Sequence, residues 1–142
     1  MTALPFGSAE WARALCDAIE RSSEYRNAGT RWGVGFNGTI LLAFEKDAVL
    51  PESRHLLLRL EAGRCRGGEM VASASHPDAG FALRAPYTLW RDILAGRTLA
   101  ATAILTGQMK VEGDKIRLLV HAGAHRALVH AVASVETVYP GA

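Results

Sequence analysis

Three histidines in the last third of the chain come nearest to a metal site by residue type and spacing. His121 and His125 are one helical turn apart, and His130 follows in the same segment. Imidazole is a common zinc ligand, but no cysteine or carboxylate stands at a spacing that would complete a tetrahedral site. We therefore expect these histidines to lie on a solvated helix surface, with no metal and no other cofactor.

Two other patterns are typical of catalytic or phosphate-binding sites. His76-Pro77-Asp78 places an imidazole near a carboxylate, as general acid–base catalysis requires, but proline and aspartate are also typical of a turn. Gly33 and Gly35 lack the further glycine and the lysine of a phosphate-binding loop, which favours a turn or bulge. No nucleophile with a neighbouring base can be named. The sequence thus indicates a protein that is not an enzyme and has no catalytic residues.

Composition narrows the possible partners. The 142 residues include 16 basic and 14 acidic ones, and the basic residues are scattered rather than clustered, which argues against nucleic acid as a partner. Cys16 and Cys65 are isolated, which is typical of free, buried thiols rather than of disulfides or zinc sites. There is no basic, apolar leader and no apolar run of membrane-spanning length. We expect one domain over residues 1–142, soluble and cytoplasmic.

In the first half of the chain, the spacing of the apolar residues changes from that of a helix to that of a strand. Ser8 suits a helix N-cap, and apolar residues three and four apart then predict a helix that ends by Gly29. From residue 30 to 44 the large apolar side chains occupy even positions, as on one face of a strand. Asn37-Gly38 interrupts this run, so a hairpin and one long strand both remain open, with the long strand slightly favoured.

The remaining elements follow from similar signals. Residues 56–60 and 65–75 predict two strands joined by a short turn, and residues 81–86 a further short strand. Helices are expected from Tyr87 to Gly96 and over 98–105. Residues 107–114 predict a last strand, which follows a helical crossover and could therefore run parallel to a neighbour. Asp114 suits the N-cap of one long, alanine-rich helix over 115–138.

This order of elements predicts an α/β (α+β) fold: a five-stranded mixed, mostly antiparallel sheet with its helices on one face. Two stretches also carry a family resemblance. Tyr87-x-x-Trp90-x-x-x-x-x-Gly96 and Gly107-x-x-x-Val111-x-Gly113-Asp114 resemble the sterol carrier protein 2 family, bacterial single-domain type, and the similarity runs from about residue 6 to residue 138. Such proteins are non-enzymatic carriers. The resemblance implies that sheet and helices enclose an apolar tunnel for a fatty acid, fatty acyl chain or sterol-like lipid.

A sheet face of large side chains opposite an alanine-rich helix is compatible with such a tunnel. Met109 is the best single lining candidate, because methionine adapts to irregular spaces. Together with residues of the helix after Asp114, the expected ligand-binding set is Trp32, Phe36, Phe81, Leu83, Tyr87, Trp90, Met109, Val111, Ile116, Leu119 and Val120.

Two functions remain open from the sequence. One is the binding and transfer of a small apolar ligand, and the other is an accessory module that docks a partner protein or a second copy, as in a homodimer, through the same apolar face. A contiguous apolar patch on the surface would favour the docking module. The identity of the ligand does not follow from the sequence.

Overall fold

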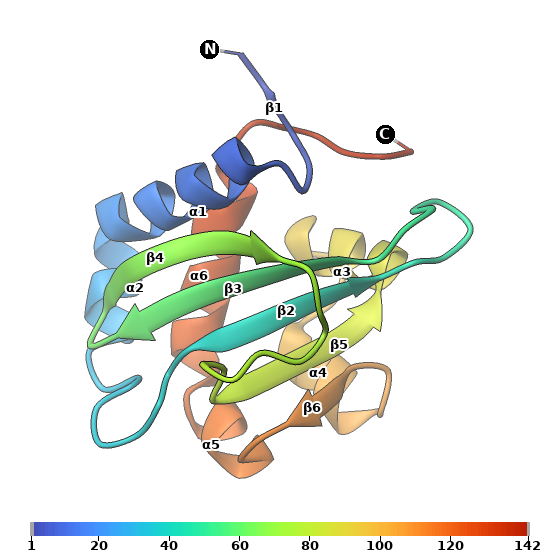
Figure 1. The fold of residues 1–142 in the computed structure, drawn as a ribbon. Coiled ribbons are helices and arrows are strands. Elements are labelled where there is room, and N and C mark those ends of the chain that lie inside the picture. Colours follow the sequence, from blue (N-terminus) through green and yellow to red (C-terminus); the bar gives the residue numbers. More distant parts are fainter. Residues whose placement is uncertain (1, 142) are drawn as a thin grey trace.

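A five-stranded sheet forms the centre of the structure, a computed structural model that describes residues 2–141 (Figure 1). Its strands are β2 (Ile40–Glu45), β3 (Arg54–Glu61), β4 (Arg64–Val71), β5 (Phe81–Pro86) and β6 (Lys110–Glu112). They lie in the order β4-β3-β2-β5-β6. Only β2 and β5 run parallel, and the other three pairs are antiparallel, which confirms the mixed, mostly antiparallel sheet.

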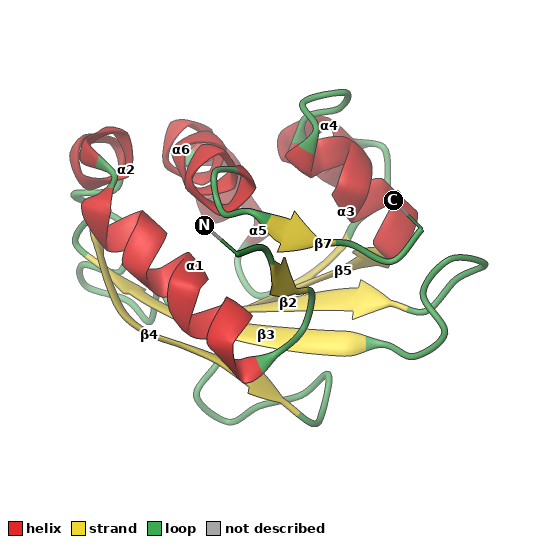
Figure 2. Cartoon of the chain, turned by 90° about the horizontal axis from the view of Figure 1, so that it is seen from above, coloured by secondary structure: helices red, strands yellow, loops and turns green. Residues whose placement is uncertain are grey.

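Within residues 2–141, six helices lie on one face of this sheet, as expected (Figure 2). They are α1 (Ala9–Arg21), α2 (Ser23–Ala28), α3 (Tyr87–Leu94), α4 (Ala100–Leu105), α5 (Lys115–Val120) and α6 (Ala122–Ala133). Both expected N-caps are confirmed. Ser8 Oγ accepts a hydrogen bond from Trp11 N at 3.1 Å, and Asp114 Oδ1 accepts one from Arg117 N at 3.1 Å. Such caps satisfy backbone N–H groups that have no partner within the helix.

Every second side chain of the central strands faces the helices, and these side chains form the core between sheet and helices. On β2 and β3, Ile40, Leu42, Leu56 and Leu58 point toward the helices and are buried in the main apolar cluster. Cys16 and Cys65 are free and buried in the same cluster, and Cys16 Sγ donates to Cys65 O at 3.4 Å. Within residues 2–141 no helix is long and apolar enough to span a bilayer.

The long strand expected over residues 30–44 is wrong, since β2 begins only at Ile40. Gly33 and Gly35 have φ angles of 82° and 81°, which no extended strand accommodates. The chain turns there instead, and the Trp32 Nε1–H donates to Gly38 O at 2.9 Å. Trp32 and Phe36 therefore reach the core from a loop and not from the sheet.

The two glycines of this loop offer a matched test. We expect Gly33→Ala to lower the free energy of unfolding by roughly 2–4 kcal/mol, because its Cβ would meet Leu60 O at 2.7 Å in addition to the positive φ. Gly35→Ala faces open space, so only the cost of the positive φ remains, about 1 kcal/mol. Urea denaturation of both variants measures the difference. Equal losses would show that the close approach to β3 is not what requires glycine.

In the last third of the chain, the structure differs from three further expectations. The helix over 115–138 is broken at His121, and residues 137–138 form β7 (Thr137–Val138), which pairs in parallel with β1 (Leu4–Pro5). In an unbroken helix Leu118 and Ala124 would lie about 120° apart around the axis, whereas both are buried here. The break therefore lets both segments face the core. In addition, β6 is antiparallel to β5, so the parallel pair is β2 and β5.

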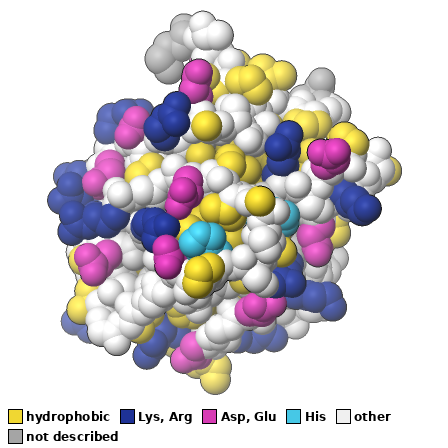
Figure 3. All heavy atoms as spheres, in the orientation of Figure 1, with side chains coloured by type: hydrophobic (Ala, Val, Ile, Leu, Met, Phe, Trp, Pro, Cys, Tyr) yellow, Lys and Arg dark blue, Asp and Glu magenta, His cyan; other side chains and the backbone are white. Residues whose placement is uncertain are grey.

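The other face of the sheet is covered by a loop segment rather than by helices. The segment over residues 72–80 crosses this face in Figure 1 and helps to bury a small apolar cluster of Leu41, Ala43, Leu57 and Ala82. Arg59 pairs with Asp78 at 2.9 Å, and Arg84 Nη2 donates to Ala74 O at 3.2 Å. The resulting surface mixes acidic, basic and small apolar patches (Figure 3). His76-Pro77-Asp78 thus belongs to a turn in the segment that covers this face of the sheet.

Candidate ligand-binding pocket

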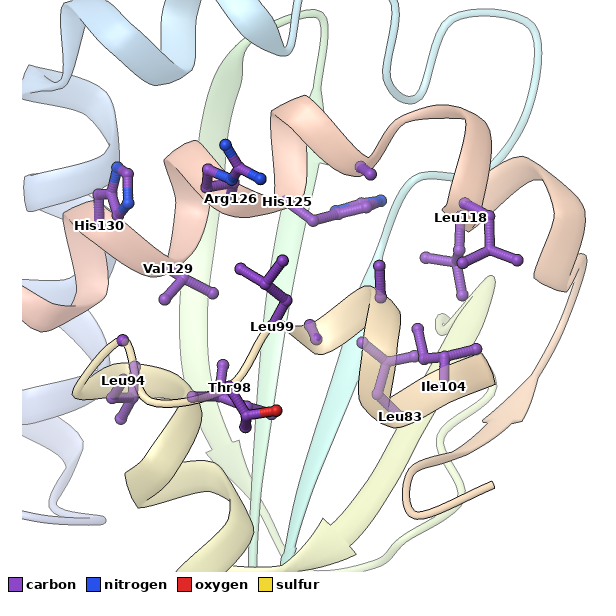
Figure 4. A pocket seen from close by; sticks show the side chains of 16 residues that line it. Leu83, Leu94, Thr98, Leu99, Ile104, Leu118, His125, Arg126, Val129 and His130 are labelled. Carbon is purple, nitrogen blue, oxygen red and sulfur yellow. The ribbon is translucent and has the colours of Figure 1, made fainter. Parts of the chain in front are cut away.

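A pocket of about 360 Å³ lies on the helical side of the sheet, between the α3–α4 segment and the α5–α6 segment (Figure 4). A volume of this size is within the range typical of small-molecule sites. Leu83 of β5 forms its floor. The walls are Ile93, Leu94, Gly96, Thr98, Leu99, Ala100, Ala101 and Ile104 on one side, and Leu118, Leu119, Ala122, His125, Arg126, Val129 and His130 on the other.

Small residues create the space. Ala100 and Ala101 begin α4, and Ala122 begins α6, so their short side chains leave a gap between the two helical segments. Larger apolar side chains then line the gap, among them Leu99 and Val129 (Figure 4). By contrast, the alanines in the middle of α6 are buried against the core. The alanine-rich helix therefore packs closely along part of its length and leaves room at its start.

His125 is the least exposed of the basic residues in the pocket wall, since Arg126 and His130 are exposed. Its Nε2 atom is inaccessible to solvent and has no hydrogen-bond partner among the described residues. Burial, and secondarily the neighbouring His121, lower its pKa to about 4, so the ring is neutral near pH 7. The imidazole packs against Trp32 with ring centroids 4.5 Å apart. A neutral, packed imidazole is compatible with an apolar ligand beside it.

The other two basic residues of the wall lie at its edge. Arg126 and His130 are both exposed, and His130 Nδ1 lies 3.1 Å from a carboxylate oxygen of Glu24. The expectation that all three histidines lie on a solvated surface is therefore right for His130 and wrong for His125. Within residues 2–141 no group of three or more histidine, cysteine or acidic side chains is placed to hold a metal ion.

The pocket includes two of the eleven residues expected to bind ligand, Leu83 and Leu119. Trp32, Phe36 and Phe81 form an aromatic cluster that packs on His121 and His125, so they support the pocket wall from behind. For these residues, contact with a ligand stays a prediction.

The other six residues lie elsewhere. Tyr87 and Trp90 are core residues whose polar atoms are engaged: Tyr87 Oη donates to Pro140 O at 2.8 Å, and Trp90 Nε1 donates to Ala43 O at 2.9 Å. Met109 is buried in the core and Val111 is half-buried on β6, both outside the pocket lining. Ile116 and Val120 point into solvent.

Sequence reasoning missed most of the α3–α4 side of the pocket. Leu94 is the last residue of α3, and Thr98 and Leu99 belong to the connection before α4. Connections carry no periodic pattern that shows which way a side chain points. One signal was present: residues 98–105 are apolar almost all round, although part of the segment is exposed. A helix that is apolar all round is normally buried, so exposed apolar side chains on it are a sign of a binding groove or an interface.

No family model and no curated protein matches this chain, whereas several solved structures do. A crystal structure of sterol carrier protein 2 is 28% identical, with a TM-score of 0.78 over 92% of this chain and 98% of that one. The solution structure of a conserved hypothetical protein from Thermus thermophilus, described as a sterol carrier protein candidate, is 25% identical, with a TM-score of 0.80 over 100% of this chain and 97% of that one.

A more distant likeness shows the fold alone. The apo form of sterol carrier protein 2 from Yarrowia lipolytica is 14% identical and has a TM-score of 0.55, with 88% of each chain covered. All three structures contain the arrangement described above over most of their length, in agreement with the resemblance of the two sequence stretches at residues 87–96 and 107–114. The chain therefore has the fold of the sterol carrier protein 2 family.

Proposed function

We propose that this protein binds a single apolar ligand, a fatty acid, fatty acyl chain or sterol-like lipid, in the pocket between α4 and α6, and carries it without catalysing a reaction. The observation that supports this most strongly is the apolar pocket of about 360 Å³ in a chain with the sterol carrier protein 2 fold. Similar structures bear the name of sterol carriers, which favours a lipid as the ligand.

The energetics of an apolar chain in this pocket are favourable. Each methylene moved from water into an apolar site gains about 0.8 kcal/mol, so some ten buried methylenes reach roughly 8 kcal/mol, near micromolar affinity. The deep walls, Leu83, Ile104 and Leu118, offer only apolar atoms to such a chain. We therefore expect broad selectivity for chain type.

The polar end of the ligand would lie at the edge of α6. Arg126 is exposed and lines the pocket, so its guanidinium can reach a carboxylate at the opening. Deeper in the wall, the neutral ring of His125 offers no charge to an ionised group. This arrangement favours a ligand that enters with its apolar end first.

A filled pocket should abolish binding. We expect Ala101→Trp to weaken the binding of a fluorescent fatty acid at least tenfold, because the indole would occupy the space between α4 and α6. The matched control is Ala133→Trp, an exposed position at the end of α6 outside the pocket, which should bind as the wild type does. Fluorescence titration measures both, and circular dichroism verifies that each variant is folded.

Native mass spectrometry of the purified protein separates this function from the docking module. A lipid that co-purifies at about one per chain, and is lost in Ala101→Trp, supports the carrier. If the wild type is empty and fails to bind the fluorescent fatty acid, the carrier function is wrong. A dimer without lipid would favour the docking module.

A further inference from the structure

β4 is an edge strand whose outer side is open. It is the last strand in the order β4-β3-β2-β5-β6, and within residues 2–141 no strand pairs with its outer side. Its eight residues include neither proline nor lysine, which commonly protect such edges from pairing with another chain. Its charged side chains, Arg64, Arg66 and Glu69, are all paired within the chain. An edge of this kind can accept a strand from another molecule.

α1 runs beside this edge and carries a row of charges (Figures 1 and 2). Glu10, Arg13, Asp17 and Arg21 are exposed and lie three or four residues apart, so they share one face of the helix. Within residues 2–141 none of the four forms an ion pair. Such a row is also typical of a solvated helix. What distinguishes α1 is its position beside an open sheet edge.

The charge row is complementary to a second copy of itself. Its signs alternate along the helix as acidic, basic, acidic, basic, and the reverse order is basic, acidic, basic, acidic. In an antiparallel pair of α1 helices, Glu10 would face Arg21 of the second copy. Arg13 would face Asp17 of the second copy, and each contact occurs twice because of the twofold symmetry. Ala14 lies on the same face, and its short side chain lets two helices approach closely.

One twofold axis pairs both elements at once. Antiparallel pairing of two β4 strands requires an axis through the middle of β4, near Gly67 and Gly68. The middle of the charge row is near residue 15 or 16. These midpoints are adjacent in the structure, since a Cβ at Gly68 would lie 2.6 Å from Ala12 O and 3.2 Å from Cys16 Cβ. The axis that pairs the strands therefore also pairs the helices.

We propose that a second copy of this chain docks on β4 and α1, so that two five-stranded sheets join into one ten-stranded sheet. The symmetry keeps the helices of both copies, and with them both pockets, on the same face of that sheet. No residue of α1 or β4 lines the pocket, so this inference goes beyond the proposed function and does not depend on it. Exposed ion pairs contribute little each, and the dimer should therefore dissociate on dilution and at high salt.

Analytical ultracentrifugation over a wide range of protein concentration tests the helix contact. Arg13→Glu places a carboxylate opposite Asp17 of the second copy, and Asp17→Arg places two guanidinium groups opposite each other. Each variant should weaken dimerisation by roughly tenfold or more, because both symmetric contacts become repulsive. A mixture of the two variants restores both ion pairs in a heterodimer, so the mixture should dimerise as the wild type does.

The matched control for charge reversal is Lys115→Glu. Lys115 is also exposed and basic, but it begins α5 directly after β6, the strand at the opposite edge of the sheet. This variant should dimerise as the wild type does. Equal weakening by Lys115→Glu and Arg13→Glu would overturn the assigned surface.

Gly67→Glu tests the strand contact. A Cβ at Gly67 would make only an ordinary contact of 3.6 Å with Arg59 Cδ, so the variant fits the monomer, and circular dichroism verifies its fold. Paired side chains share a face of the sheet, so position 67 would lie opposite position 67 or Glu69 of the second copy. In either register two carboxylates meet, and dimerisation should weaken by roughly tenfold.

Each remaining outcome has one meaning. A wild type that stays monomeric at high concentration and low salt overturns the inference. A mixture of Arg13→Glu and Asp17→Arg that does not dimerise overturns the helix pairing, and a dimer unaffected by Gly67→Glu overturns the strand pairing. Fatty acid binding by Arg13→Glu should equal that of the wild type, so the proposed function is tested separately.

Discussion

Trp32→Ala is expected to lower the free energy of unfolding by about 3–5 kcal/mol, the usual cost of removing a large buried aromatic side chain. Trp32 is fully buried at the centre of the aromatic cluster, with its ring centroid 5.0 Å from that of Phe36 and 4.9 Å from that of Phe81. The variant also loses the hydrogen bond to Gly38 O. Urea denaturation followed by circular dichroism measures the loss.

A neighbouring position provides the control. Val34 lies two residues away in the same loop but points into solvent, so Val34→Ala should change stability by less than about 0.5 kcal/mol. Trp32 also supports His125, and we therefore expect Trp32→Ala to weaken fatty acid binding even where the protein remains folded. A loss of stability below about 1 kcal/mol would show that the loop over residues 30–39 is not part of the core.

The second large effect is a dependence of stability on pH that His125→Phe removes. Burial lowers the pKa of His125 from 6.5 to about 4 in the folded protein. The unfolded chain therefore binds a proton first as the pH falls. The stability linked to neutral His125 is fully present above about pH 6.5 and is lost as the pH falls toward 4, by on the order of 3 kcal/mol in total.

Phenylalanine keeps an aromatic ring against Trp32 and has no polar atom to leave unpaired. His125→Phe should therefore be at least as stable as the wild type at pH 7 and clearly more stable at pH 5. Part of the slope will remain, because burial also lowers the pKa of His55. Urea midpoints between pH 7 and pH 4.5 give the slope for both proteins, and an NMR titration of the His125 ring reports its pKa directly. Equal slopes would contradict the buried, neutral imidazole.

Exposed apolar side chains bear on the choice between carrier and docking module. Ile116 and Val120 on α5 and Leu99 before α4 are exposed, and such residues would favour docking, whereas the pocket favours a carrier. One molecule can have both features. The two functions expected from the sequence as alternatives are therefore compatible.

Several parts of the fold followed from local signals alone. The alternation over residues 56–60 and 81–86 predicted two strands, and Ser8 and Asp114 predicted two helix starts, because alternation and capping depend on neighbouring residues only. The two stretches that carry the family resemblance led to the same fold. The strand prediction was wrong at Gly33 and Gly35, because apolar residues continue to occupy every second position through a segment that is a loop.

The pocket depended on tertiary packing. Large side chains such as Trp32, Phe81 and Met109 were expected to line a cavity. They are buried in the core, and their contact with a ligand stays a prediction, while the pocket lies where Ala100, Ala101 and Ala122 meet across two helical segments. Residue type determined that these side chains avoid water. Which of them face a partner and which face a gap was decided by how the helices sit on the sheet and by the break at His121, since a cavity is the space that side chains from several elements fail to fill.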